Sequence, residues 1–189
     1  MATKLHIAVL SNIIFEPHFL LLTKQYFGEN TAVFPIPFGE HTEVEYQTQV
    51  TSADLIVVWL NTGTLLPGQF YSLAEQDSDD TIALCKKLYA DLTGISHVKI
   101  LWFLFEDYAI PLSAAVGHVY HDLADKLNLL LRDALGNQVS FVDLKHLIAE
   151  IGISNAYDSK GKYRWNAPYS KTLVEAAVRE IHKQYLIQK

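Results

Sequence analysis

The sequence predicts a single α/β domain, residues 1–189, in which a doubly wound, five-stranded parallel sheet lies between two layers of helices. Apolar runs typical of strands alternate along the chain with segments of helical periodicity. The inner runs Asp54–Leu60 and Val98–Phe105 are almost continuously apolar, as expected for strands buried on both faces. The chain has 189 residues, of which 50% are hydrophobic, so one domain with a sizeable core is expected.

Five segments are expected to be strands. In chain order they are Leu5–Leu10, Thr31–Ile36, Asp54–Leu60, Val98–Phe105 and Val139–Val142. Crossovers in parallel sheets are right-handed and helices must cover both faces, which favours the order 2-1-3-4-5 of flavodoxin-like sheets. In that order the first and third strands are neighbours, and a crevice opens beyond their carboxyl ends.

Helices are expected between the strands and at the end of the chain. The clearest apolar stripe runs through His118–Leu135. The expected helices are Phe15–Phe27, Glu43–Val50, Phe70–Leu92, His118–Leu135, Asp143–Ile151 and Ser170–Leu186. Between the last two, Gly152–Pro168 is expected to form a long polar loop, because it lacks a clear period.

Composition narrows the possible partners and the location. Lys and Arg total 15 against 21 Asp and Glu, and this excess of acid argues against nucleic-acid and anionic-membrane partners. Cys85 is the one cysteine, so no disulfide framework or cysteine zinc site is expected, and a reducing, cytoplasmic location is the natural expectation. No apolar run approaches the roughly 18 residues of a membrane span. The first ten residues are expected to contain a strand rather than a signal peptide.

No cofactor or metal is expected. The turn after the first strand lacks glycine, and neither GxGxxG nor GxxxxGK[ST] occurs in the sequence, so a phosphate cradle is missing. Four residues of one predicted helix have a spacing that could hold a metal: His118, His121, Asp122 and Asp125. The alternative is a solvated helix face, which we favour because no ligand from another element is evident.

Polar residues follow the strands at the predicted crevice. Ser11 stands where the first strand ends, and its hydroxyl could act as a nucleophile near a helix amino end. Asn61 follows the third strand and could donate its amide to an oxyanion, assisted by the backbone N–H groups of Asn12 and Gly39. Glu106 follows the fourth strand, with no role assigned. The structural alternatives are a helix N-cap for Ser11 and a turn residue for Asn61.

These residues give the sequence a resemblance to the SGNH-hydrolase superfamily. Ser11 and Asn12 fall at its nucleophile block, Gly39 near its oxyanion glycine, and Asp54–Asn61 on its asparagine block. A closer resemblance is to the amino-terminal SGNH-like domain of FkbH-like proteins, through the opening 8–12 and the segment 157–170. Those proteins usually continue into a HAD-type domain that loads a three-carbon unit onto an acyl carrier protein. This sequence contains no HAD signature DxDx[TV], so the resemblance implies the front domain alone, free-standing or part of a longer protein.

The sequence departs from active SGNH hydrolases at the base. They place a histidine shortly before the last helix, three residues after an aspartate. Here the nearby aspartate is Asp158, a candidate acid, but Gly161 stands three residues later. A base would have to come from elsewhere, and His41 after the second strand is better placed than His18 in the first helix. Without a base, Ser11 remains a poor nucleophile.

Three functional hypotheses follow. The first is a binding domain for a small acyl or phosphopantetheinyl ligand in polyketide or related secondary metabolism, a context implied by the resemblance alone. Its partners would be an acyl carrier protein or a HAD-type phosphatase-like domain. The second is an active esterase or acyltransferase with Ser11 as nucleophile and a displaced base. The third is an interaction domain with a vestigial pocket. Trp165 and Tyr169 are expected to cover the crevice lined by Ser11, Gly39 and Asn61 as part of the loop Gly152–Tyr169, for which the alternative is a purely structural Ω-loop.

Overall fold

The computed structural model confirms an α/β fold with five parallel strands in the order β2-β1-β3-β4-β5. The structure describes residues 4–13, 18–61, 75–106, 114–158, 160 and 168–187, and of residues 75–78 and 114–123 it describes only the backbone. The strands are β1 (Leu5–Ser11), β2 (Thr31–Pro37), β3 (Leu55–Trp59), β4 (Ile100–Phe103) and β5 (Ser140–Val142). Among the described residues, no helix is both long and apolar enough to cross a membrane.

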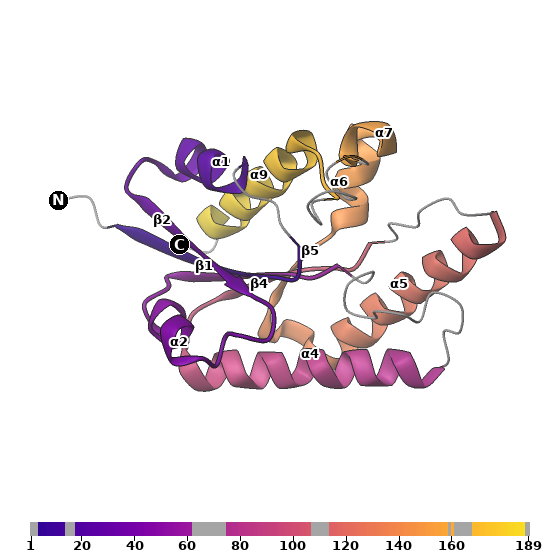
Figure 1. The fold of residues 1–189 in the computed structure, drawn as a ribbon, viewed down its shortest axis with the longest axis horizontal. Coiled ribbons are helices and arrows are strands. Elements are labelled where there is room, and N and C mark those ends of the chain that lie inside the picture. The colour runs from indigo at the N-terminus through magenta and orange to yellow at the C-terminus, as the bar shows by residue number, and fades with distance from the viewer. Residues whose placement is uncertain are drawn as a thin grey trace.

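Helices cover both faces of the sheet. Figure 1 shows α1, α6 and α9 on one side and α2, α4 and α5 on the other. The helices are α1 (His18–Phe27), α2 (Val44–Thr51), α4 (Glu75–Ile95), α5 (Ala114–Leu135), α6 (Leu144–Ile151), α7 (Ile153–Ala156) and α9 (Lys171–Ile187). Side chains of a strand alternate between the two faces. Accordingly, Ile7 and Val9 of β1 belong to the core under α1 and α9, whereas Ala8 and Leu10 belong to the core under α4 and α5.

Two parts of the sequence prediction need correction. The apolar run Val98–Phe105 forms a strand only over Ile100–Phe103, since the sheet ladder ends before the apolar residues do. The segment Gly152–Pro168 contains the short helix α7 in addition to loop. Gly152 separates α6 from α7 with a φ of 84°, a left-handed conformation that glycine adopts without strain.

Asparagine side chains continue the hydrogen bonding where the ladders of β3 and β4 stop. Asn12 Nδ2 donates to the Asn61 carbonyl at 2.8 Å, and Asn12 Oδ1 accepts from the Asn61 N–H at 2.7 Å. Asn128 of α5 makes the same pair of hydrogen bonds with Phe105. Its Oδ1 accepts from the Phe105 N–H at 2.7 Å, and its Nδ2 donates to the Phe105 carbonyl at 2.8 Å. These two carboxamides satisfy the buried backbone just beyond the strands and fix the chain there.

Replacing Asn128 with Ala should lower the free energy of unfolding by about 3 kcal/mol. The substitution leaves the N–H and C=O of Phe105, a residue with no exposed surface, without their partners, and each such group costs about 1–3 kcal/mol. Urea unfolding measures the loss. Asp133→Ala, at an exposed position of the same helix, should change stability by no more than about 0.5 kcal/mol, and an equal effect of the two substitutions would contradict this account.

Candidate functional site

Ser11 is the last residue of β1, at the carboxyl edge of the sheet. It is in register with Pro37 of β2 and Trp59 of β3. Because it follows Leu10 in the strand, its side chain lies on the face covered by α1 and α9. Its Oγ accepts from the Ile13 N–H at 3.1 Å and donates to the Ile13 carbonyl at 3.0 Å. The hydroxyl is therefore engaged in a local turn, and it does not cap α1, which begins at His18.

The other residues of the predicted crevice gather around this strand end. Asn12 holds the backbone of Asn61, as described above, and so joins the ends of β1 and β3. The N–H of Phe38 donates to the Ser11 carbonyl at 2.9 Å, and Gly39 is the next residue along the chain. Gly39 is exposed and has a φ of 94°. We call this group, completed by Tyr169, the Ser11–Asn61 site.

A buried carboxylate organises the part of the site around Asn61. Glu106, just beyond β4, is only 2% exposed. Its Oε1 accepts from Asn61 Nδ2 at 2.9 Å and from the Tyr169 hydroxyl at 2.9 Å, and its Oε2 accepts from the Tyr157 hydroxyl at 2.7 Å. Asn61 Nδ2 also lies 3.2 Å from the Tyr169 hydroxyl. The sequence pattern predicted no role for Glu106 or Tyr157; the available signal was an acid placed directly after the apolar residues 100–105.

Tyr169 lies just before α9, in the segment where the resemblance to SGNH hydrolases leads us to expect a histidine base. Its ring stacks on Trp59 with centroids 5.2 Å apart, and Trp59 in turn stacks on Phe103 at 4.4 Å. Burial raises the pKa of Tyr169 well above its ordinary value, and the negative charge of Glu106 raises it further. A phenol that stays protonated and donates to a carboxylate cannot accept a proton from Ser11. Tyr169 is thus not suited to act as a general base for Ser11.

Replacing Glu106 with Gln should lower the pKa of Tyr169, because the Gln side chain removes the charge while keeping an acceptor oxygen. The pKa should remain above the ordinary tyrosine value, since burial is the larger cause of the shift. The measurement is a titration of tyrosinate absorbance against pH in the wild type and in Glu106→Gln. In each case the curve of the same protein carrying Tyr169→Phe is subtracted, which leaves the signal of Tyr169. A pKa that is unchanged, or higher, in the Gln variant would contradict the role assigned to the carboxylate.

The candidate acid and base have other partners. His41 is buried, and its Nε2 lies 3.3 Å from Asp91 Oδ2 of α4, on the side of the sheet opposite to the Ser11 side chain. Among the described residues its Nδ1 has no hydrogen-bond partner. Asp158 is exposed, and its Oδ1 accepts from the Lys160 N–H at 3.0 Å. The structure does not bring either side chain to Ser11. Trp165 lies outside the described residues.

The candidate metal face on α5 is only partly described. The side chains of His118, His121 and Asp122 lie outside the description, and Asp125 pairs with Lys145 of α6 at 2.7 Å. Among the described residues, no three His, Cys, Asp or Glu side chains cluster in a way that could hold a metal ion.

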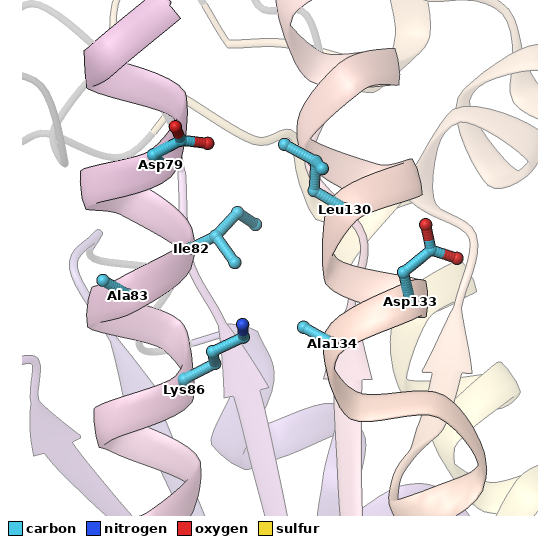
Figure 2. Close-up of a pocket in the computed structure, with 7 residues that line it drawn as sticks. All are labelled: Asp79, Ile82, Ala83, Lys86, Leu130, Asp133 and Ala134. Atoms are coloured by element: carbon cyan, nitrogen blue, oxygen red, sulfur yellow. The ribbon is translucent and has the colours of Figure 1, made fainter.

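A groove of about 410 Å³ lies between α4 and α5, away from the Ser11–Asn61 site. Figure 2 shows Ile82 and Lys86 of α4 pointing toward α5. The residues that line it are Asp79, Ile82, Ala83, Lys86, Leu130, Asp133 and Ala134. Because these helices cover the face opposite to the Ser11 side chain, the groove is not part of that site.

Comparison with known proteins identifies the fold. No protein-family model matches the sequence, and no curated protein matches it significantly. Among solved structures, the chain resembles the N-terminal part of BF1531 from Bacteroides fragilis, which contains a phosphatase domain and was solved with Mg (14% identity, TM-score 0.67). The chain is covered to 98% and spans 52% of that structure, or about half its length.

Two further neighbours are named for acyl chemistry. The lipase Lip_vut3 from a goat rumen metagenome is 14% identical with a TM-score of 0.66, covering 96% of this chain and 97% of its own. The salicylyl-acyltransferase SsfX3 from a tetracycline biosynthetic pathway is 17% identical with a TM-score of 0.58, covering 98% of this chain and 56% of its own. The protein has an SGNH-like fold, as the resemblance in its sequence implies.

Proposed function

We propose that this chain is an SGNH-like domain that binds an acyl or phosphopantetheinyl group and lacks standard esterase activity. Its partner would be an acyl carrier protein or a HAD-type phosphatase-like domain, in an FkbH-like protein of polyketide or related secondary metabolism. Residues 1–189 would form one domain of that protein in the cytoplasm, where a lone cysteine such as Cys85 stays reduced. No cofactor is part of this proposal.

The observation that carries the proposal is the hydrogen bonding of Ser11. Within the described residues, its Oγ bonds to the backbone of Ile13 and to no histidine. Serine is activated by a base within hydrogen-bond reach, and general-base assistance is typically worth about 10²–10⁴-fold. Tyr169 stands in the region where the resemblance would place the base, and its hydroxyl donates a hydrogen bond to Glu106 instead. A site that keeps the serine and the asparagine without a base is suited to holding an acyl group rather than cleaving it.

The names of two structural neighbours support a phosphatase-like partner and an acyl ligand. SsfX3 is named as an acyltransferase of a biosynthetic pathway, and the N-terminal part of BF1531 contains a phosphatase domain. Each of these structures is about twice as long as this chain. Their structural similarity to this chain therefore supports an SGNH-like domain that works beside a second domain.

The alternative is an active esterase or acyltransferase in which Ser11 is the nucleophile and His41 or another group is the base. The observation that favours it is the placement of Ser11 and Asn61 at the ends of neighbouring strands, joined by Asn12. Several structural neighbours are named as lipases.

Hydrolysis of p-nitrophenyl acetate separates the two functions. We expect the wild type to hydrolyse it slowly, within about tenfold of Ser11→Ala, because a general base is worth about 10²–10⁴-fold and Ser11 has none. His41→Ala should have no effect. Turnover at ordinary enzyme rates that Ser11→Ala abolishes would establish the esterase instead, and loss in His41→Ala as well would identify the displaced base.

Binding is measured directly by titrating an acyl carrier protein, with and without its phosphopantetheine arm, onto the domain. We expect saturable binding that requires the phosphopantetheine arm. This binding should weaken in Tyr169→Ala, which removes a side chain of the Ser11–Asn61 site. Binding that ignores the arm would favour a protein-interaction surface elsewhere. Trp165→Ala should change the affinity more than the melting temperature if the long loop takes part; a change in melting temperature alone would make the loop structural.

A further inference from the structure

The groove between α4 and α5 combines apolar side chains with charges that have no partner within the chain. Ile82, Ala83 and Leu130 are among the residues that line it. Asp79 and Lys86 of α4 are exposed, and both side chains point toward α5 (Figure 2). Among the described residues, neither of the two makes a hydrogen bond or an ion pair. An apolar groove flanked by an unpaired acid and an unpaired base is suited to contact with another surface that carries both charges.

The charges of α4 are separated along the helix. Its first six residues, 75–80, include four acids, and the next charged residues in the sequence are Lys86 and Lys87. Acids near the amino end complement the helix dipole, but the dipole gives no reason for lysines in the middle of the helix. Asp79 and Lys86 are seven residues apart, about 10 Å along the axis at 1.5 Å per residue, which is too far for them to pair with each other.

A second α4 helix, laid antiparallel on the first, would pair these charges twice. The midpoint between Asp79 and Lys86 falls between Ile82 and Ala83. A two-fold axis at this point would set Asp79 of each copy opposite Lys86 of the other, with apolar side chains at the centre. The short side chain of Ala83 would let the two helices approach closely. A parallel arrangement would instead place acid against acid, so the charge pattern favours the antiparallel one.

Helix α5 extends the apolar surface beside α4. Leu130 and Ala134 line the groove from this side. Leu129 is 62% exposed, and it shares a helix face with Asp133, another lining residue, four positions later. A single exposed leucine is ordinary on a protein surface, but this one adjoins a groove that is already apolar. A helix lying in the groove would therefore contact apolar side chains of α4 and α5 together.

We propose that a second copy of this chain occupies the groove, with the two α4 helices antiparallel and Asp79 of each copy paired with Lys86 of the other. The occupant is a second copy because the unpaired charges on α4 complement the same charges after a two-fold rotation. This inference goes beyond the proposed acyl-binding function and does not depend on it. The helices α4 and α5 cover the face of the sheet opposite to the Ser11 side chain, so the contact does not involve the Ser11–Asn61 site.

Sedimentation velocity of the 189-residue chain tests the contact. The wild type should dimerise with a dissociation constant below about 0.1 mM, in the range of a weak, reversible interface. Lys86→Glu and Asp79→Lys should each weaken self-association at least about tenfold, because each sets like charges against each other at both ends of the contact. An equimolar mixture of these two variants should dimerise about as well as the wild type, since every facing pair is again of opposite charge.

Lys24→Glu serves as the matched control for net charge. Lys24 is exposed on α1, on the other side of the sheet, and this substitution should leave dimerisation unchanged. A wild type that stays monomeric up to about 1 mM overturns the proposal. So does a mixture of Lys86→Glu and Asp79→Lys that stays monomeric while the circular dichroism of both matches the wild type. Equal weakening by Lys86→Glu and Lys24→Glu would also overturn it, because net charge alone would then govern association.

Discussion

The carboxylate of Glu106 is the contact on which the carboxyl edge of this sheet depends. The ends of β3 and β4 and the two ends of the segment between Tyr157 and Tyr169 all meet at its two oxygens. That segment is closed at its base by a bridge in which the Asp158 N–H donates to the Pro168 carbonyl at 2.8 Å. One buried charge therefore anchors the sheet edge, the following loop and the entry into α9. An apolar side chain at this position could fill the space but would leave Asn61, Tyr157 and Tyr169 without this acceptor.

Asparagine side chains give this edge a second kind of support. Asn12 and Asn128 each imitate a neighbouring strand, with one donor and one acceptor directed at a backbone residue just past the ladder. Strand ends usually carry mobile loops, because backbone groups beyond the ladder turn to water for partners. Here the two carboxamides hold Asn61 and Phe105, and they deliver Asn61 and Glu106 to each other at 2.9 Å.

The sequence predicted the sheet and its order because long apolar runs and right-handed crossovers leave few alternatives. It overestimated the strand that ends in Phe105, since apolar character reports burial and not ladder pairing; the partner that ends the ladder, Asn128, comes from a helix 23 residues further on. It also missed α7, a single turn with too few residues to show a period. Positions at strand ends, such as Ser11 and Asn61, follow from topology alone. The contact between Glu106 and Tyr169 spans 63 residues and has no local signature.

The two halves of the site have opposite chemical properties, which bears on how the site works. The β1 side consists of the hydroxyl of Ser11 and the exposed backbone of Gly39, and neither residue carries a charge. On the β4 side stands a buried negative charge that already holds the Asn61 amide. Covalent catalysis at Ser11 would create an oxyanion between these halves, where stabilisation depends on amide hydrogens that are not already committed to a stronger acceptor. The carboxylate of Glu106 is a stronger acceptor than a neutral carbonyl, so the Asn61 N–H that it already holds is poorly available to a ligand oxygen. Because the Asn61 amide already bonds to Glu106, the arrangement supports the proposal of a site that binds an acyl group without cleaving it.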